Sequence, residues 1–430
     1  MSEPSSSPVS AVPAVPSSSV GLELRTITAE EWSAWYDMLE RAFGGMPESA
    51  EERELWQGLT ELDRSIGVFD GKQPVAAAGA FSFRLALPGG VPLLPTAGVT
   101  MVGVLPTHRR RGLLTRMMRH QLDDVRERGE AVAVLTASEP GIYGRFGYAV
   151  AAAQMRVAIP RHRVRLDSDL GRDLRLRLAD PAEAVAGCEA LYERVGPARP
   201  GWVARPPGWE RQPLLDPPSE RGGLTPLGCV LVEDPESGGL LGYARYAVRP
   251  DWEFSGPSGT VVVHEVLAAT PAAYAALWRF LLDVDLTDTV TARNLAVDDP
   301  LLHLVSDVRR CEAHLRDGLH ARLVDVGAAL AARRYATPLD VVFEVSDPFC
   351  RWNEGRWRLS GDADGAVCAR TTDAADLQLT VRELSAAYLG GFALSALAGA
   401  GRVQELRAGA LPETSRAFAS DIAPWLPRGF

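Results

Sequence analysis

Lysine is nearly missing from this sequence of 430 residues, which contains one lysine, Lys72, beside 44 arginines. We interpret this imbalance as a coding bias without functional content. Cysteine is also scarce, because the chain has five scattered cysteines and none forms a CxxC pair or a cluster with histidine. The sequence therefore predicts no disulfide framework and no metal site, and it fits a reducing cytoplasm.

Several widespread motifs are absent as well. The sequence has no GxGxxG, GxxxxGKS/T, HExxH or GxSxG segment, and its seven histidines show no ligand spacing. These absences exclude a motif-based assignment to dinucleotide-binding proteins, P-loop proteins, zinc metalloproteases or α/β-hydrolases.

Long apolar runs and a basic charge balance are also missing. No apolar run reaches the roughly 20 residues that a membrane helix needs. Residues 1–20 are rich in Ser, Pro, Ala and Val and carry no secretory-signal pattern, so we expect a disordered lead-in. The net charge of -10 argues against a nucleic-acid partner and favours cationic small molecules, although acidic balance is also common in soluble proteins.

The first part of the chain, residues 21–165, alternates between strand and helix patterns. Residues 99–105 and 131–136 read as buried strands on either side of a helix at 112–128. This order predicts a crossover in an α/β layer. Earlier in the chain, Thr28–Glu31 has the pattern of a capping box and predicts a helix that buries Trp32, Trp35, Tyr36 and Leu39.

The two later parts of the chain show different patterns of predicted strands and helices. Residues 166–310 repeat a strand at 260–268 and a helix that Thr270 caps and Pro271 opens, without an arginine-glycine loop between them. Residues 311–430 show four short strands followed by two helices, which is typical of an α+β module. The predicted strands are 340–345, 356–360, 366–371 and 377–381, and the predicted helices are 383–392 and about 415–422. The apolar end, 424–430, is expected to dock on the protein.

The segment Val102–Thr115 carries the strongest chemical signal. It ends a buried strand, turns through Pro106-Thr107 and leads three arginines into a helix start. A pyrophosphate needs backbone N–H donors, a helix N-terminus and close approach, which Gly112 allows because it has no side chain. The alternative is an arginine-rich helix start on a solvated face. The flanking strands favour the phosphate site.

A second segment, Ala137–Tyr148, follows the next strand and places Tyr143 beside that loop. A phenol, whose unperturbed pKa is about 10, can protonate a departing thiolate. The alternative is a tyrosine that packs near a glycine-rich turn.

Together these two segments resemble the GNAT superfamily of N-acetyltransferases, and in particular its Eis (enhanced intracellular survival) branch. The resemblance rests on PTHRRRGLL at 106–114 and on the ASE-to-IYGRFGY run within 137–149. It extends with weaker matches at 389–391 and 418–421 to Phe430. It implies an α/β and α+β fold: a catalytic GNAT domain at 21–165, a degenerate GNAT-like domain at 166–310 and a sterol-carrier-like domain at 311–430, in a homohexamer.

The resemblance also implies roles for individual residues. Tyr143 corresponds to the general acid, and the carboxylate of Phe430 corresponds to the general base that takes the amine proton. The alternative for Phe430 is a terminal aromatic residue that only packs. The acetyl-CoA contacts carry over to Val102, Gly103, Val104, Arg110, Arg111, Gly112, Leu113, Leu114, Thr115, Ser138 and Glu139.

The substrate side departs from the family pattern. Gly44-Gly45 replaces a polar stretch in the loop 43–49, Trp56 lies further along than the family's tryptophan, and Met101 stands where some members have an aromatic residue. Leu114 departs from the superfamily loop but matches the Eis branch. A differently shaped pocket is expected.

The predicted activity is acetyl transfer from acetyl-CoA to a primary amine of a polycationic substrate, with aminoglycosides as the first choice. Peptide or protein lysines and polyamines are the alternative substrates. A non-catalytic lipid carrier is the alternative from another class. Neither a nucleic acid nor a membrane is expected as a partner.

Overall fold

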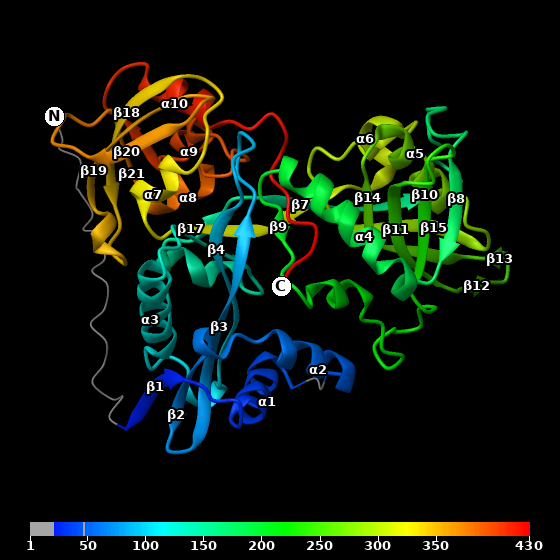
Figure 1. Ribbon diagram of the computed structural model, residues 1–430, viewed down its shortest axis with the longest axis horizontal. Helices are drawn as coiled ribbons and strands as arrows, with labels where there is room; N and C mark the ends of the chain where they lie inside the picture. Colours follow the sequence, from blue (N-terminus) through cyan, green and yellow to red (C-terminus); the bar gives the residue numbers. More distant parts are fainter. Residues whose placement is uncertain (1–20, 46–47) are drawn as a thin grey trace, which may run out of the picture. The chain divides into compact units, whose positions relative to one another are not determined.

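The computed structural model describes residues 21–45 and 48–430 (Figure 1). The predicted lead-in 1–20, and Met46 and Pro47 of the loop 43–49, lie outside the described residues. The chain divides into two compact units. The first contains the described residues up to 45 together with 61–79 and 101–121, and the second contains 48–60, 80–100 and 122–430.

The first unit begins with an antiparallel arrangement. Strand β1 (Leu22–Thr26) pairs with β2 (Ile66–Asp70), which pairs with the start of β3 (Gln73–Leu85). Helix α1 (Trp32–Phe43) buries all four residues predicted for its apolar face. Its start differs from the prediction, because Glu31 is the N-cap and makes no side-chain cap. The Glu31 carboxylate bonds the Thr28 N–H at 3.1 Å but is also held by Arg25.

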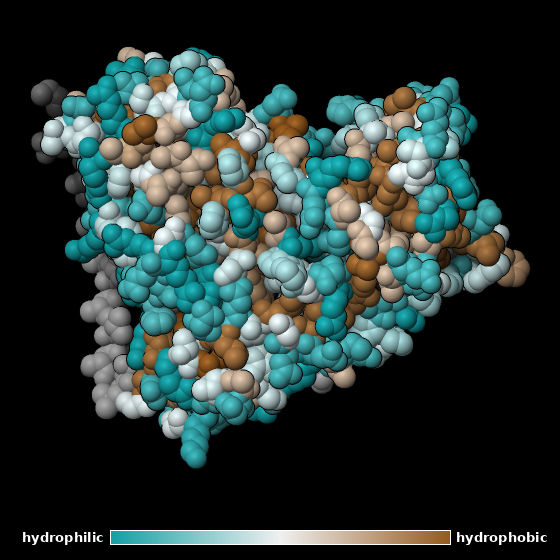
Figure 2. Space-filling view, viewed as in Figure 1, coloured by the Kyte–Doolittle hydropathy of each residue, from teal (hydrophilic) through white to brown (hydrophobic). Residues whose placement is uncertain are grey.

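The loop of chemical interest lies between a strand and a helix, as predicted. Strand β4 (Leu94–Val104) ends in a short 3₁₀ turn, η2 (Pro106–His108), and α3 (Leu113–Glu127) follows. Of the six residues predicted for the apolar face of α3, Leu114 is half-buried and the other five are buried: Leu113, Met117, Met118, Leu122 and Val125. Hydrophilic side chains cover much of the surface over α3 (Figure 2). The predicted amphipathic helix is confirmed.

In the second unit, β4 pairs in parallel with β5 (Val132–Thr136) over residues 96–98 and 132–134. This parallel pair around α3 is the predicted crossover. The next strand in the sheet comes from far along the chain: β17 (Leu319–Leu323) pairs with β5 on one edge and β6 (Ala149–Val150) on the other. A segment after residue 310 therefore completes the sheet that carries the candidate site.

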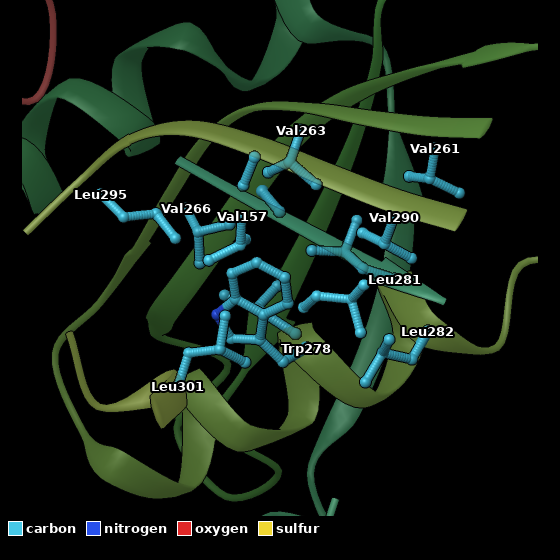
Figure 3. Close-up of a cluster of buried hydrophobic side chains, with 14 of the residues drawn as sticks. Val157, Val261, Val263, Val266, Trp278, Leu281, Leu282, Val290, Leu295 and Leu301 are labelled. Carbon is cyan, nitrogen blue, oxygen red and sulfur yellow. The ribbon is translucent and has the colours of Figure 1, made fainter. Parts of the chain in front are cut away.

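A second sheet has the order β16-β7-β15-β14-β11-β10-β8. Its strands are β7 (Ala153–Pro160), β8 (Arg175–Ala179), β10 (Gly228–Glu233), β11 (Leu240–Arg249), β14 (Gly259–Ala268), β15 (Thr287–Leu295) and β16 (His314–Asp317). Helix α5 (Pro271–Leu282) connects the parallel pair β14 and β15, and the Thr270 side chain caps it as predicted. The ring of Trp278 lies in the centre of this core (Figure 3). Helix α4 (Pro181–Val195) and helix α6 (Leu301–Leu304) belong to the same region.

The third sheet has the order β20-β19-β18-β21-β22. Its strands are β18 (Leu339–Ser346), β19 (Gly355–Gly361), β20 (Ala366–Arg370), β21 (Leu377–Thr380) and β22 (Val403–Glu405). Its helices are α7 (Val326–Ala331), α8 (Val381–Ala387), α9 (Leu394–Gly399) and α10 (Ala410–Phe418). The last two predicted helices were misplaced. Helix α8 begins earlier because Thr380 and Glu383 form a capping box, and it ends at Ala387. Helix α10 ends at Phe418.

Helix α2 (Ala50–Leu59) and the 3₁₀ segment η5 (Trp209–Leu214) complete the elements that matter for the site. Within the described residues, no helix is both long and apolar enough to cross a lipid bilayer.

Candidate active site

The loop after β4 has the backbone of a phosphate cradle. Arg110 has a φ of 63° and Gly112 a φ of 79°, so the chain turns twice through the left-handed region before α3 begins. The Arg116 N–H bonds the Gly112 carbonyl at 3.0 Å and starts the helical ladder. The N–H groups before it have no partner within the helix and point towards its N-terminal end.

The three arginines of the loop are not equivalent. Arg109 bonds the carbonyls of Val104 and Ala42, both at 3.2 Å, and so ties the loop to β4 and α1. Arg110 and Arg111 remain the arginines that the resemblance assigns to acetyl-CoA. The donors of this loop fit a pyrophosphate, since they combine backbone N–H groups, a helix N-terminus and guanidinium groups.

Tyr143 lies in the second unit, on the 3₁₀ segment η3 (Pro140–Phe146) that follows β5. Its side chain is 9% exposed, and its ring packs edge-on against Tyr148. Burial raises the pKa of Tyr143 to about 12, and the charge of Glu139, the N-cap of η3, adds to the rise. The phenol therefore stays protonated at neutral pH, which a general acid requires.

The glycines beside Tyr143 are needed for contacts with residues from much later in the chain. A Cβ on Gly144 would lie 2.8 Å from the guanidinium carbon of Arg382. A Cβ on Gly147, whose φ is 89°, would lie 2.7 Å from Nε of Arg322. The IYGRFGY motif thus keeps two positions small so that two arginines can pack against the turn.

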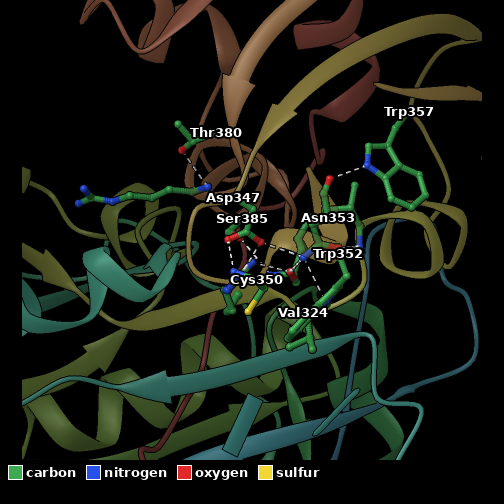
Figure 4. A network of polar contacts seen from close by, with 12 residues as sticks. Val324, Asp347, Cys350, Trp352, Asn353, Trp357, Thr380 and Ser385 are labelled. Atoms are coloured by element: carbon green, nitrogen blue, oxygen red, sulfur yellow. Dashed lines mark hydrogen bonds and ion pairs between the residues drawn. The ribbon is translucent and has the colours of Figure 1, made fainter. Parts of the chain in front are cut away.

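Arg322 is itself held by a buried polar network, whose members Asp347 and Asn353 are labelled in Figure 4. Its guanidinium donates to Asp347 at 2.7 Å and to the Leu323 carbonyl at 2.7 Å. Asp347 also accepts bonds from the Asn353 side chain at 2.9 Å and from the Cys350 N–H at 3.0 Å. This network joins the turn that carries Tyr143 to the third sheet, and sequence patterns gave no signal of it.

Phe430, the last residue of the sequence, lies beside the end of β5. The ring of Phe430 packs edge-on against Phe83 with centroids 4.8 Å apart, and the Thr136 hydroxyl reaches its carbonyl oxygen at 3.5 Å. Gly98 makes room for this arrangement, because a Cβ there would come within 2.3 Å of Phe83 and 3.2 Å of Phe430. The predicted docking of the terminal segment is confirmed.

Aromatic rings extend from Phe430 to a group of carboxylates. Trp209 packs edge-on against Phe83 and Phe81, at 4.9 and 4.8 Å between centroids, and Trp56 of α2 packs against Phe81 and Trp209. The indole N–H of Trp56 donates to Glu52 at 3.3 Å. The sequence analysis named Phe430 and Trp56 but missed Phe81, Phe83 and Trp209.

Glu52 is a carboxylate of this group with a raised pKa. Burial raises the pKa of Glu52 to about 7, and the charges of Glu48 and Glu220 raise it further. Glu220 accepts the Ser49 N–H at 2.8 Å, which brings the carboxylates to the start of α2. This concentration of negative charge suits a cationic substrate.

The predicted site residues fall in two places. Tyr143, Phe430, Ser138 and Glu139 lie in the second unit, where the last two residues are exposed at the end of β5. Val102–Thr115 lies in the first unit, including every acetyl-CoA contact predicted on β4 and the loop. Across the described ranges, no group of three or more His, Cys, Asp or Glu side chains could hold a metal ion.

Three family models match successive parts of the chain. Residues 23–151 and 201–323 each match a model described as an acetyltransferase (GNAT) domain, and 326–427 match a sterol carrier protein domain. These matches confirm the predicted fold class of two GNAT-like domains and a sterol-carrier-like domain. GNAT acetyltransferases use acetyl-CoA.

Relatives match over nearly the whole chain. An uncharacterized N-acetyltransferase from Streptomyces avermitilis is 59% identical over 409 residues, which cover 95% of this chain and 99% of that protein. N-acetyltransferase Eis from Mycobacterium bovis is 36% identical over 414 residues, which cover 92% and 96% of the two chains. The crystal structure of Eis1 from Mycobacterium abscessus is 35% identical, with a TM-score of 0.82, and the match covers 95% of this chain and 100% of that one. On this similarity the chain belongs to the Eis family of GNAT N-acetyltransferases.

Proposed function

We propose that this N-acetyltransferase transfers acetyl groups from acetyl-CoA to primary amines of polycationic small molecules, with aminoglycosides as the first choice. The observation that carries the proposal is the group of carboxylates around Glu52 at the start of α2, which a row of packed aromatic rings connects to Phe430. Carboxylates attract the ammonium groups of such a substrate. The rings of Trp56 and Phe430 are only half-buried, so they can contact a sugar ring or a cation. A polyamine or a lysine side chain carries the same charge but lacks the rings of an aminoglycoside.

In the proposed reaction, acetyl-CoA supplies an acetyl thioester. The Phe430 carboxylate accepts the proton that the amine loses as its nitrogen forms the bond to the acetyl carbon. The Tyr143 hydroxyl gives its proton to the sulfur as the carbon–sulfur bond breaks, and solvent returns a proton to the tyrosine. The raised pKa of Tyr143 supports the donor role, because the residue holds its proton until it is needed.

The loop 106–112 and the start of α3 bind the pyrophosphate of acetyl-CoA in this proposal, through backbone N–H groups and the side chains of Arg110 and Arg111. The backbone of Val102–Val104 pairs with the pantetheine arm as an added strand would. Ser138 and Glu139 line the approach after β5.

The test measures thiol release from acetyl-CoA with aminoglycosides, polyamines and lysine peptides, using the intact protein and a variant without Phe430. We expect the highest kcat/KM with an aminoglycoside and a large loss of kcat without Phe430. A higher kcat/KM with lysine peptides would make peptides, not aminoglycosides, the substrate class. Unchanged turnover in the protein without Phe430 would contradict its role as the base. Lipid binding without acetyl-CoA binding would favour the carrier function.

Two further properties are proposed from the family resemblance, a homohexamer and a cytoplasmic location. Light scattering coupled to size exclusion measures the first, and cell fractionation measures the second.

A further inference from the structure

The segment before Phe430 is held by the region of the second sheet. Asp298 and Arg199 form an ion pair at 2.7 Å, and both also bond the backbone of Ala423. Oδ2 of Asp298 accepts the Ala423 N–H at 2.8 Å, and the Arg199 guanidinium donates to the Ala423 carbonyl at 2.8 Å. One ion pair therefore satisfies both polar backbone groups of one residue of the terminal segment.

Two residues later, Trp425 adds three contacts of its own. Its backbone N–H donates to the Pro200 carbonyl at 2.8 Å, and its indole N–H donates to the Asn294 carbonyl on β15. Its ring packs edge-on against Trp202 with centroids 5.7 Å apart. Trp425 thus joins a hydrophobic cluster that includes residues of α4 and β10.

Two glycines leave space for this segment. A Cβ on Gly201 would lie 3.0 Å from the Trp425 nitrogen, and φ at Gly201 is 84°. A Cβ on Gly391 would lie 2.6 Å from the Pro424 ring. We define residues 423–425 as the tail anchor and the pair Asp298 and Arg199 as its clamp.

We propose that the clamp is a positioning device for the reaction: the second GNAT-like domain, which lacks the arginine-glycine loop, holds the terminal carboxylate of Phe430 where the amine proton must go. This inference rests on the proposed role of Phe430. Asp298 and Arg199 act through the tail and touch no substrate.

The physical reason is the length of chain between Trp425 and the carboxylate of Phe430. Phe430 lies five positions after Trp425, and the carboxylate at the end of a chain of that length could shift by several ångströms if the anchor were released. Proton transfer needs the acceptor within hydrogen-bond distance, and a misplacement of about 1 Å can cost about 100-fold in rate. The clamp shortens the free length of the tail and so limits this movement.

A first experiment reads the position of the tail without reading activity. The variants are Asp298→Ala and Arg199→Ala, and the matched control is Glu233→Ala, which removes an ion pair with Arg177 of 2.8 Å in the same domain. A carboxypeptidase that prefers aromatic ends is added to each native protein, and mass spectrometry follows the loss of Phe430. We expect trimming about 10-fold faster in both clamp variants and wild-type trimming in the control. Equal rates in all four proteins would overturn the clamp, whatever Phe430 does.

A second experiment reads the reaction. Both clamp variants should lose about 10-fold to 100-fold in kcat and keep the wild-type KM for acetyl-CoA, since the phosphate loop is untouched. In proteins that also lack Phe430, the same substitutions should change kcat by less than about twofold, because the group they position is gone. An equal loss with and without Phe430 would mean a general structural effect and would overturn the proposal.

The two proposals fail differently. If removal of Phe430 alone leaves kcat unchanged, the assignment of Phe430 as the base is wrong. The clamp can still protect the tail from the carboxypeptidase in that case. If removal of Phe430 lowers kcat but the clamp variants trim and react like wild type, the base stands and the clamp is wrong.

Discussion

Nε of Arg322 lies where a side chain on Gly147 would have to go, 2.7 Å from the position of its Cβ. The contact joins two residues 175 positions apart, because Gly147 ends the turn that carries Tyr143 and Arg322 lies on β17. Arg322 is fully buried and depends on Asp347 for its charge partner. The geometry of the catalytic turn therefore depends on an ion pair with the third sheet.

Gly147→Ala should destabilise the fold by about 2 kcal/mol or more, because it combines a positive φ with displacement of the Arg322 side chain. Gly129→Ala is the matched control. Gly129 has a φ of 75°, but nothing lies within 4 Å of its Cβ position. Urea unfolding should show a larger loss for Gly147→Ala, and equal losses would mean that the Arg322 contact adds nothing.

Asp347→Ala should cost about 3–5 kcal/mol, because it leaves the guanidinium of Arg322 buried without a counter-charge. Arg322 and Asp347 are 0% and 1% exposed. A variant that changes both residues, Arg322→Met with Asp347→Leu, should recover much of this loss. If the single substitution unfolds at the wild-type denaturant concentration, the pair does not hold the turn.

Tyr143→Phe should lower kcat by about 100-fold to 10,000-fold and leave the acetyl-CoA dissociation constant unchanged. The neighbouring Tyr148 offers the control, since its hydroxyl is buried and makes no hydrogen bond within the described chain. Tyr148→Phe should keep the wild-type kcat and fold at least as stably, because it removes an unsatisfied polar group. Similar kcat losses in both variants would contradict the acid role of Tyr143.

Local patterns in the sequence predicted the elements around the loop well. The spacing of apolar residues and of glycine predicts the buried strands 99–105 and 131–136 and the helix between them. This spacing is visible among residues that are close in the sequence. The cap of α5 was equally local, since Thr270 and Pro271 stand side by side. The capping box at Thr28–Glu31 formed only in part, because the Glu31 carboxylate accepts the Thr28 N–H at 3.1 Å but the helix begins later, with Glu31 as its N-cap.

The rest of the site depends on contacts between distant segments. No local pattern predicts that β17 inserts between β5 and β6, because its pairing partners are about 170 to 190 residues earlier. The clamp on Ala423 joins three segments in the same way. The family resemblance named Phe430, but only the structure gives the residues that hold its segment.

The pH dependence of kcat should show the raised pKa of Tyr143. Because the acid must be protonated and its pKa is about 12, kcat should not fall between pH 8 and 11 as a phenol of pKa about 10 would require. The raised pKa of Tyr143 should also make the fold less stable at high pH. The folded pKa exceeds the unfolded value of about 10, so this contribution is complete below pH 10 and is lost as the pH rises towards 12. A kcat that falls around pH 10 in wild type, with no such fall in Tyr148→Phe, would contradict the assignment.

Glu52 should make substrate affinity depend on pH near neutrality. Its pKa of about 7 means that the carboxylate gains its charge as the pH rises through 7, so the KM for a polycation should fall by about threefold to fivefold over that interval. A primary amine bearing quaternary ammonium groups is the substrate for this test, because those charges do not titrate. Glu52→Gln should remove the fall in KM, and an uncharged monoamine should not show it in the wild type.

The ionisation of Glu52 should also change the stability of the fold, in the direction opposite to its effect on substrate affinity. The folded pKa of Glu52 lies above its unfolded value of about 4.5, so its contribution is complete below pH 4.5 and is lost as the pH rises to about 7. The matched control is Glu51→Gln, on the same turn of α2 but exposed. It changes the net charge equally and should keep the wild-type pH dependence of KM. If Glu51→Gln and Glu52→Gln act alike, the effect comes from overall charge, and Glu52 has no special part in binding the amine.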